Sequence, residues 1–143
     1  MTTLYQVCKD DLIVNITFAW EGAIAIVKEF DEDALVSHRF PTFVFNKNKA
    51  ISDYFKYIIL QKRFIFMLGL ISPGGAGRNR VLNQKDFIKL NVALPSVPEQ
   101  QKIADCLNSL NNEIELLQKK NELLKKQKQG LMQVLLTGKV RVN

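Results

Sequence analysis

The sequence has only one histidine, two cysteines and one tryptophan among its 143 residues. Cys8 and Cys106 stand alone, without a C-x-x-C spacing and without a cluster around His38, so the four ligands of a zinc site are missing. Isolated cysteines of this kind are typical of free thiols in a reducing compartment. We therefore expect a cytoplasmic protein that binds no metal and needs no cofactor.

Long hydrophobic runs are also absent. The most apolar segment, residues 64–71, is too short to cross a bilayer and directly follows Lys62 and Arg63. No signal peptide is apparent at the start of the sequence. The sequence therefore predicts no association with a membrane, and we interpret the apolar segment as the end of a buried helix.

The motifs of common enzyme classes are missing as well. The glycine-rich segment 74–80 lacks the Lys-Ser/Thr ending of a phosphate-binding loop, and there is no G-x-G-x-x-G nucleotide turn. The sequence identifies no nucleophile with which the single histidine could form a catalytic dyad. The acidic residues 31–33 are most simply a solvated turn. We therefore expect a protein without catalytic activity.

What the chain does carry is a mild excess of positive charge, +6 at neutral pH with an isoelectric point near 9.4. This charge is compatible with nucleic acid binding without being diagnostic of it. The loop 74–80 is the most suggestive segment, because its glycines allow close backbone approach and its polar side chains suit phosphates or base edges. A solvated surface loop would have the same composition. The candidate DNA-binding residues are Arg39, Lys47, Lys49, Arg78, Asn79 and Arg80.

Three of these candidates lie outside the glycine-rich loop. Lys47 and Lys49 occupy a polar turn, where they would contact phosphates or have no binding role. Arg39 could contact DNA, or it could pair with the acidic turn that precedes it in the sequence.

Residues 1–95 have the pattern of a small domain of mixed strands and helices. Short β-branched and apolar runs, broken by polar turns, predict strands at 4–7, 11–17, 23–27, 35–36 and 40–45. From Ser52 onwards apolar residues recur at helical spacing, which predicts one helix that ends before Ser72. A last strand is predicted at 87–94. This order of elements, followed by a long helix, indicates an α+β fold.

Residues 96–143 form a second region, a helical arm. From Ile103 onwards ten positions follow one another at alternating four- and three-residue steps, the 3.5-residue period of a coiled-coil seam. An S-x-x-E capping signal opens the helix at Ser96, and Gly138 follows its expected end. The helix would reach roughly 60 Å, too far for so small a domain to cover its apolar stripe. The seam positions are Ile103, Leu107, Leu110, Ile114, Leu117, Asn121, Leu124, Lys128, Leu131 and Leu135.

The seam favours an antiparallel partner helix. In a parallel, in-register pair Lys128 would face its own copy and Lys120 would face Lys125 of the partner subunit, and both arrangements are repulsive. An antiparallel pair separates these lysines and lets the acidic first turns approach the basic far ends. Asn121 fits either arrangement. The alternative is a solitary amphipathic helix that packs on residues 1–95.

The junction LPSVPEQQKIA at 94–104, the helix after it and the terminal LLTGKVRV at 135–142 resemble the specificity subunit of type I restriction-modification systems. Segments 20–23, 36–37, 40–45 and 77–82 look like the later part of that family's target recognition domain. The resemblance covers nearly the whole chain. It implies two recognition domains held apart by an antiparallel helix pair, with each domain reading one half of a bipartite double-stranded DNA sequence.

The same resemblance implies that the helices dock methyltransferase subunits and, through them, the restriction (translocase) subunit. Residues 1–95 would then be a partial recognition domain and residues 96–143 a spacer and dimerisation arm of a non-catalytic subunit. Because the family's domain is normally longer, we expect a half-length or truncated chain that forms an antiparallel homodimer or pairs with another specificity chain. The alternative is a scaffold fragment that binds methyltransferase or specificity subunits without reading DNA.

Overall fold

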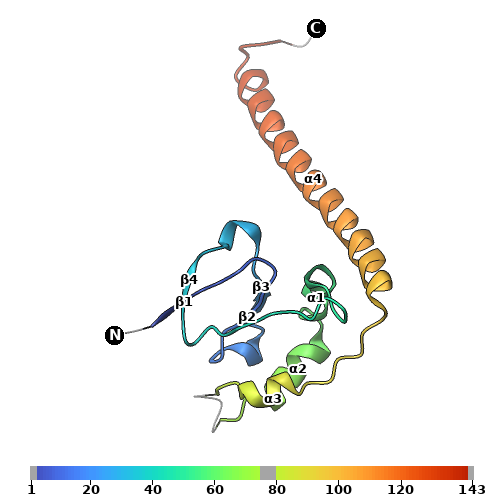
Figure 1. Cartoon of the computed structure of the whole chain (residues 1–143). Coiled ribbons are helices and arrows are strands. Elements are labelled where there is room, and N and C mark those ends of the chain that lie inside the picture. The colour runs from blue at the N-terminus through green and yellow to red at the C-terminus, as the bar shows by residue number, and fades with distance from the viewer. Residues whose placement is uncertain (1–2, 75–79, 142–143) are drawn as a thin grey trace. The chain divides into compact units, whose positions relative to one another are not determined.

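The computed structural model describes residues 3–74 and 80–141, and it divides the chain into two compact units, Met1–Ala104 and Asp105–Asn143. Unit 1 contains two small antiparallel sheets and three short helices, and the long helix α4 (Val97–Leu135) begins in it (Figure 1). Unit 2 consists of the remainder of α4 and the residues after it. The α+β fold class with a long C-terminal helix is confirmed. The functional division into residues 1–95 and 96–143 stays a prediction.

A three-stranded antiparallel sheet forms one wall of the core of unit 1. Its strand order is β3 (Ile24–Ile26), β2 (Leu12–Val14), β5 (Thr42–Phe43), and Ile13 pairs with Ala25 on one side and Thr42 on the other. Because side chains alternate along a strand, Leu12 and Val14 face the core and are almost fully buried. Ile13, between them, points to the opposite face and stays partly exposed.

A second, two-stranded sheet pairs β1 (Leu4–Gln6) with β4 (Leu35–Ser37), with Tyr5 opposite Val36. All three residues of β1 are exposed. Strands therefore form at all five predicted positions, although most are shorter than predicted. Two short 3-10 helices lie in the connections: η1 (Ala19–Glu21) between β2 and β3, and η2 (Glu29–Asp31) between β3 and β4. Gly22 ends η1 with a φ of +92°, and a Cβ at this position would lie 3.2 Å from the Ile65 side chain, so glycine suits this position on both counts.

The single helix predicted from Ser52 is wrong, because the chain forms two helices, α1 (Ser52–Ile58) and α2 (Lys62–Leu70). The backbone at Gln61 is extended, with φ −73° and ψ 134°. A continuous helix would have placed Lys62 and Arg63 on the stripe of Phe55 and Ile58. The break instead turns Phe64 and Leu68 into the core.

The strand predicted at 87–94 is also wrong. Residues 84–88 form the short helix α3 (Gln84–Ile88), and residues 89–96 have no regular secondary structure. The helix begins here because the Asn83 side chain accepts hydrogen bonds from the backbone N–H groups of Lys85 and Asp86. The alternating apolar residues that suggested a strand do pack on the core, at Leu90, Val92 and Leu94, but as an unpaired chain.

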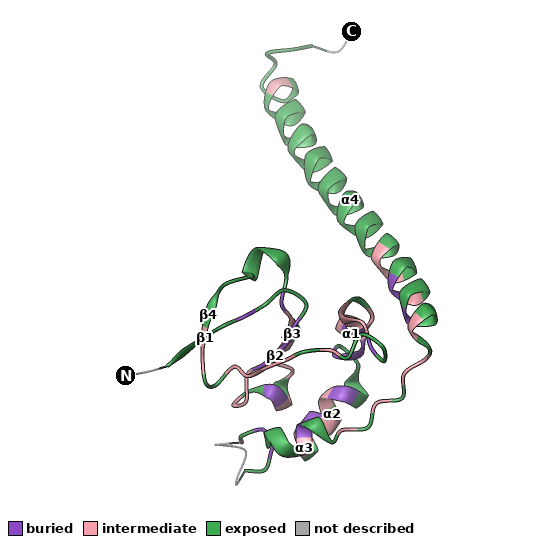
Figure 2. Cartoon of the chain, in the orientation of Figure 1, coloured by how far each residue is buried: buried purple, intermediate pink, exposed green. Residues whose placement is uncertain are grey.

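The core of unit 1 lies between the three-stranded sheet and the short helices. Its buried residues, purple in Figure 2, lie mainly on β2, α1 and α2. Aromatic rings connect these elements: Phe45 lies 5.1 Å from Phe55, and Phe55 meets Phe64 edge-on at 5.7 Å between ring centroids. Phe43 and Phe87, 4.9 Å apart, join β5 to α3 in the same way.

Helix α4 follows the prediction closely. The N–H groups of Glu99 and Gln100 donate to the Ser96 carbonyl oxygen, and Gly138 is left-handed, with a φ of +71°. From Asp105 to Arg141 no described residue is buried. The seam leucines Leu110, Leu117 and Leu124 are 51%, 57% and 53% exposed. Within the described residues, none of the helices combines the length and the hydrophobicity that a membrane span needs.

Candidate nucleic-acid interface

The turn between β4 and β5 borders an open groove of about 400 Å³. Backbone hydrogen bonds define the turn: the Phe40 N–H donates to Ser37 O, and the Ile16 N–H donates to Arg39 O. Arg39, the first candidate DNA-binding residue, lies exposed between two residues of the groove's lining. The groove is lined by Tyr5, Ser37, His38, Phe40, Pro41, Thr42 and Gln84.

The basic turn 46–49 presents two further candidates. The Asn46 side chain accepts the Asn48 N–H, and the Asn46 carbonyl accepts the Lys49 N–H, so the turn has a defined conformation. Lys47 and Lys49 are exposed, and within the described residues their side chains, like that of Arg39, form no hydrogen bond or ion pair. These three cations are therefore available to an external anion.

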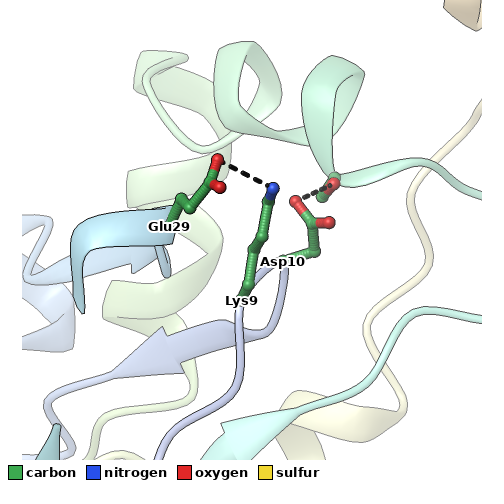
Figure 3. Close-up of polar contacts among 4 residues, drawn as sticks. Lys9, Asp10 and Glu29 are labelled. Atoms are coloured by element: carbon green, nitrogen blue, oxygen red, sulfur yellow. Dashed lines mark hydrogen bonds and ion pairs between the residues drawn. The ribbon is translucent and has the colours of Figure 1, made fainter. Parts of the chain in front are cut away.

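Lys47 also lines a second groove, of about 260 Å³, together with the charged residues Lys9, Asp10 and Asp11, which directly precede β2. Figure 3 shows that cluster: Lys9 Nζ lies 3.0 Å from Glu29, while Asp10 accepts a hydrogen bond from the Ser52 hydroxyl at 3.0 Å. The hydrogen bond and charge of Glu29 raise the pKa of Lys9. Because Glu29 neutralises Lys9, Lys47 is the cation of this groove that has no ion pair with any of the described residues.

Asp11, which lines the same groove, is 9% exposed. Burial raises the pKa of its carboxyl group, and a hydrogen bond from the Cys8 backbone opposes that rise. Asp10 takes up a left-handed φ of +70° in the turn that Asp11 closes through its N–H bond to Cys8 O. Asp10 and Asp11 therefore belong to the structure of this turn. Among the described residues there is no cluster of three Asp, Glu, His or Cys side chains that could hold a metal ion.

The basic turn is fastened to the start of α4 by one buried side chain, Gln100. Its Nε2 donates to Lys49 O at 2.8 Å and to Pro95 O at 2.9 Å, and its Oε1 accepts the Ile51 N–H at 3.2 Å. Gln100 is fully buried, which is unusual for glutamine and is tolerated because every polar atom of the amide has a partner. In the sequence Gln100 stands out only as part of the junction motif, because hydrogen bonds across 49 to 51 residues leave no local signal.

Of the three candidate DNA-binding residues in the glycine-rich loop, the structure describes only Arg80. Arg78 and Asn79 lie outside the described residues. Arg80 uses its guanidinium group within the fold: Nε donates to Ser72 O at 3.0 Å, Nη2 donates to Gly69 O at 2.6 Å, and the group stacks 4.9 Å from the Trp20 ring. A Cβ at Gly74 would lie 2.8 Å from the Arg80 Cα, so the chain closes tightly here. A DNA contact by Arg80 stays a prediction, while a packing role is observed.

Comparison with known proteins gives one consistent result. The sequence model of the family described as "Type I restriction modification DNA specificity domain" matches residues 4–126. The chain is 30% identical over 119 residues to the MjaVIII type I restriction enzyme specificity subunit of Methanocaldococcus jannaschii, which covers 83% of this chain and 28% of that protein. A second protein of that organism, the putative MjaX specificity subunit, is 31% identical over 134 residues, 78% of this chain and 30% of the relative.

A solved structure shares the fold. The crystal structure of the HsdS subunit from Thermoanaerobacter tengcongensis matches with a TM-score of 0.69 and 19% identity, over 90% of this chain and 33% of that one. The chain therefore spans about a third or less of the length of the proteins it resembles.

Proposed function

Because the chain belongs to the family of type I restriction-modification DNA specificity domains, we propose that it is a non-catalytic DNA-reading subunit of such a complex. Unit 1 reads one half-site of double-stranded DNA, and α4 acts as a coiled-coil spacer that docks methyltransferase subunits. The observation that supports the spacer most strongly is the apolar stripe of α4, whose residues are 39–57% exposed from Leu110 to Leu135.

Phosphate contacts supply most of the affinity in this proposal. Arg39, Lys47 and Lys49 are exposed cations on two ordered turns, as contacts to a DNA backbone require. Each phosphate contact that forms releases counterions and adds about 0.9 to the slope of log K against log salt concentration. Binding should therefore weaken steeply as salt is raised, and each lysine should carry a measurable share of that slope.

The partner of α4 in this proposal is a second copy of the chain or another specificity chain, antiparallel to it. The supporting argument is electrostatic: a parallel, in-register pair would set Lys128 against its own copy, whereas an antiparallel pair would not. The restriction subunit would join indirectly, through the methyltransferase subunits.

Fluorescence anisotropy with labelled duplex DNA tests the proposal, for the chain alone and with a methyltransferase subunit, at several salt concentrations. We expect salt-dependent binding, and Lys47→Ala or Lys49→Ala should each reduce the salt slope by about 1. Lys126→Ala is the matched control, because Lys126 is an exposed lysine of α4 outside the seam. Firm binding to the methyltransferase subunit without any DNA affinity would refute DNA reading and identify a scaffold instead.

A further inference from the structure

The groove beside the β4–β5 turn has features that the basic turns lack. It brings together side chains from β1, from residues 37–42 and from the first residue of α3, segments up to 79 positions apart in the sequence. We propose that this groove reads the edge of one base pair, with Gln84 as the specificity-determining residue and adenine as its base. This inference rests on the proposed function, since it names the residue through which unit 1 would select a sequence.

The chemistry of the lining supports a base edge as the ligand. The Gln84 amide offers a donor and an acceptor side by side, which match N7 and the N6 amino group of adenine in the major groove. Around it lie further polar groups, on Tyr5, Ser37, His38 and Thr42. Phe40 and Pro41 add apolar surface of the kind that contacts a thymine methyl group.

The groove is also built on fixed elements, as a reading site requires. Gln84 begins α3 directly after Asn83, whose side chain caps the helix and whose N–H donates to Ile71 O. On the other side, the Val14 N–H donates to Pro41 O, which ties the β4–β5 turn to the central strand of the sheet. A mobile loop could not hold an amide in register with one base; these anchors can.

Charge around the groove agrees with a DNA ligand. Arg39 and Lys85 are exposed and immediately adjacent in sequence to lining residues, where phosphates that flank a bound base pair could meet them. Among the described residues no acidic side chain belongs to the lining, and the nearest in sequence, Asp86, is partly buried on α3. An anionic polymer could therefore approach without meeting an exposed carboxylate of the lining.

Selection from a pool of random duplexes, followed by sequencing, tests the proposal on the full chain with its methyltransferase subunit. The variants are Gln84→Ala, Gln84→Glu and, as a matched control, Gln129→Ala on the exposed part of α4. Gln84→Ala should lower the preference for adenine at one position by about 5- to 150-fold, and leave the other positions and the salt slope unchanged. Gln84→Glu, which can only accept, should shift that position towards cytosine.

The outcomes separate the inference from the function on which it rests. Unchanged preferences in both Gln84 variants, or an equal loss at every position with the fold intact by circular dichroism, would overturn the reading role of the groove and leave the proposed function standing. If the unmodified complex selects no sequence at all, the proposed function fails and this inference fails with it.

Discussion

Replacement of Gln100 tests what holds the first turn of α4 against the basic turn within unit 1. In Gln100→Ala three backbone groups lose their partners: the Ile51 N–H and the carbonyl oxygens of Lys49 and Pro95. An unsatisfied buried polar group costs about 1–3 kcal/mol. Because these groups are only partly buried and water can reach some of them, we expect a loss of about 3–5 kcal/mol in the free energy of unfolding, a large value for one substitution.

Urea denaturation followed by the fluorescence of Trp20 measures this loss. Trp20 is the only tryptophan and lies in unit 1, so its emission reports the unit that Gln100 holds together. With a urea m-value of about 2 kcal/mol/M, the midpoint should fall by about 1.5–2.5 M. Gln100→Glu should be no more stable than Gln100→Ala, since it would place a carboxylate against the carbonyl oxygens of Lys49 and Pro95.

Gln118→Ala provides the control, because Gln118 is an exposed glutamine of the same helix. Both substitutions change helix propensity equally, so their difference isolates the buried amide. If the two variants denature at the same urea concentration, the hydrogen bonds of Gln100 contribute nothing to stability. The connection of α4 to the basic turn would then have no energetic basis.

Three further predictions concern the seam, the loop and a buried acid. Charged residues in place of Leu117 and Leu124 should convert dimers to monomers in analytical ultracentrifugation, and an unmodified protein that already sediments as a monomer would exclude homodimerisation. Arg78→Ala should weaken DNA binding more than Lys126→Ala in a quantitative titration; Arg80→Ala should do the same but also lower the thermal midpoint, because it removes two backbone hydrogen bonds and the contact with Trp20. Since burial raises the pKa of Asp11, its ionisation opposes folding above that pKa. The stability advantage of Asp11→Asn over the unmodified protein should therefore shrink as the pH falls from about 7 to about 4, and an advantage independent of pH would contradict the assignment.

The sequence predicts those parts of the fold that depend on local periodicity. Strand alternation at Leu12 and Val14 and the long repeat of α4 are visible because one face of each element is apolar and the spacing repeats. The two wrong predictions, the single helix from Ser52 and the strand at 87–94, lie where burial or a helix cap outweighs the local hydrophobic periodicity. At Gln61 the core takes up Phe64 in place of the charged residues that a continuous helix would bury, and at Gln84 the Asn83 cap starts a helix in what reads as a strand.

The candidate site is harder to predict from the sequence than the fold, because the type of a side chain does not reveal whether it contacts a ligand or packs within the fold. Arg39, Lys47 and Lys49 are candidates because of their charge, and all three side chains lie exposed. Arg80 is a candidate for the same reason, yet its guanidinium group donates hydrogen bonds to carbonyl oxygens of α2 and of the segment that follows it. Gln84 and Tyr5 gave no signal, because their groove exists only after three distant segments meet.

Arg80 lies in the glycine-rich loop and Gln100 in the junction motif, and both side chains serve the fold. Each side chain donates hydrogen bonds to two backbone oxygens: Arg80 to Gly69 at the end of α2 and Ser72 after it, and Gln100 to Lys49 in the basic turn and Pro95 just before α4. Both side chains therefore fix segments that belong to neither sheet. The exposed cations Arg39, Lys47 and Lys49 and the polar groove beside the β4–β5 turn are not used in this way and stay accessible to a ligand. At the two lysines and at Gln100, DNA affinity and fold stability should therefore respond to different substitutions. Lys47→Ala and Lys49→Ala should change the salt slope at constant urea midpoint, whereas Gln100→Ala should lower the urea midpoint.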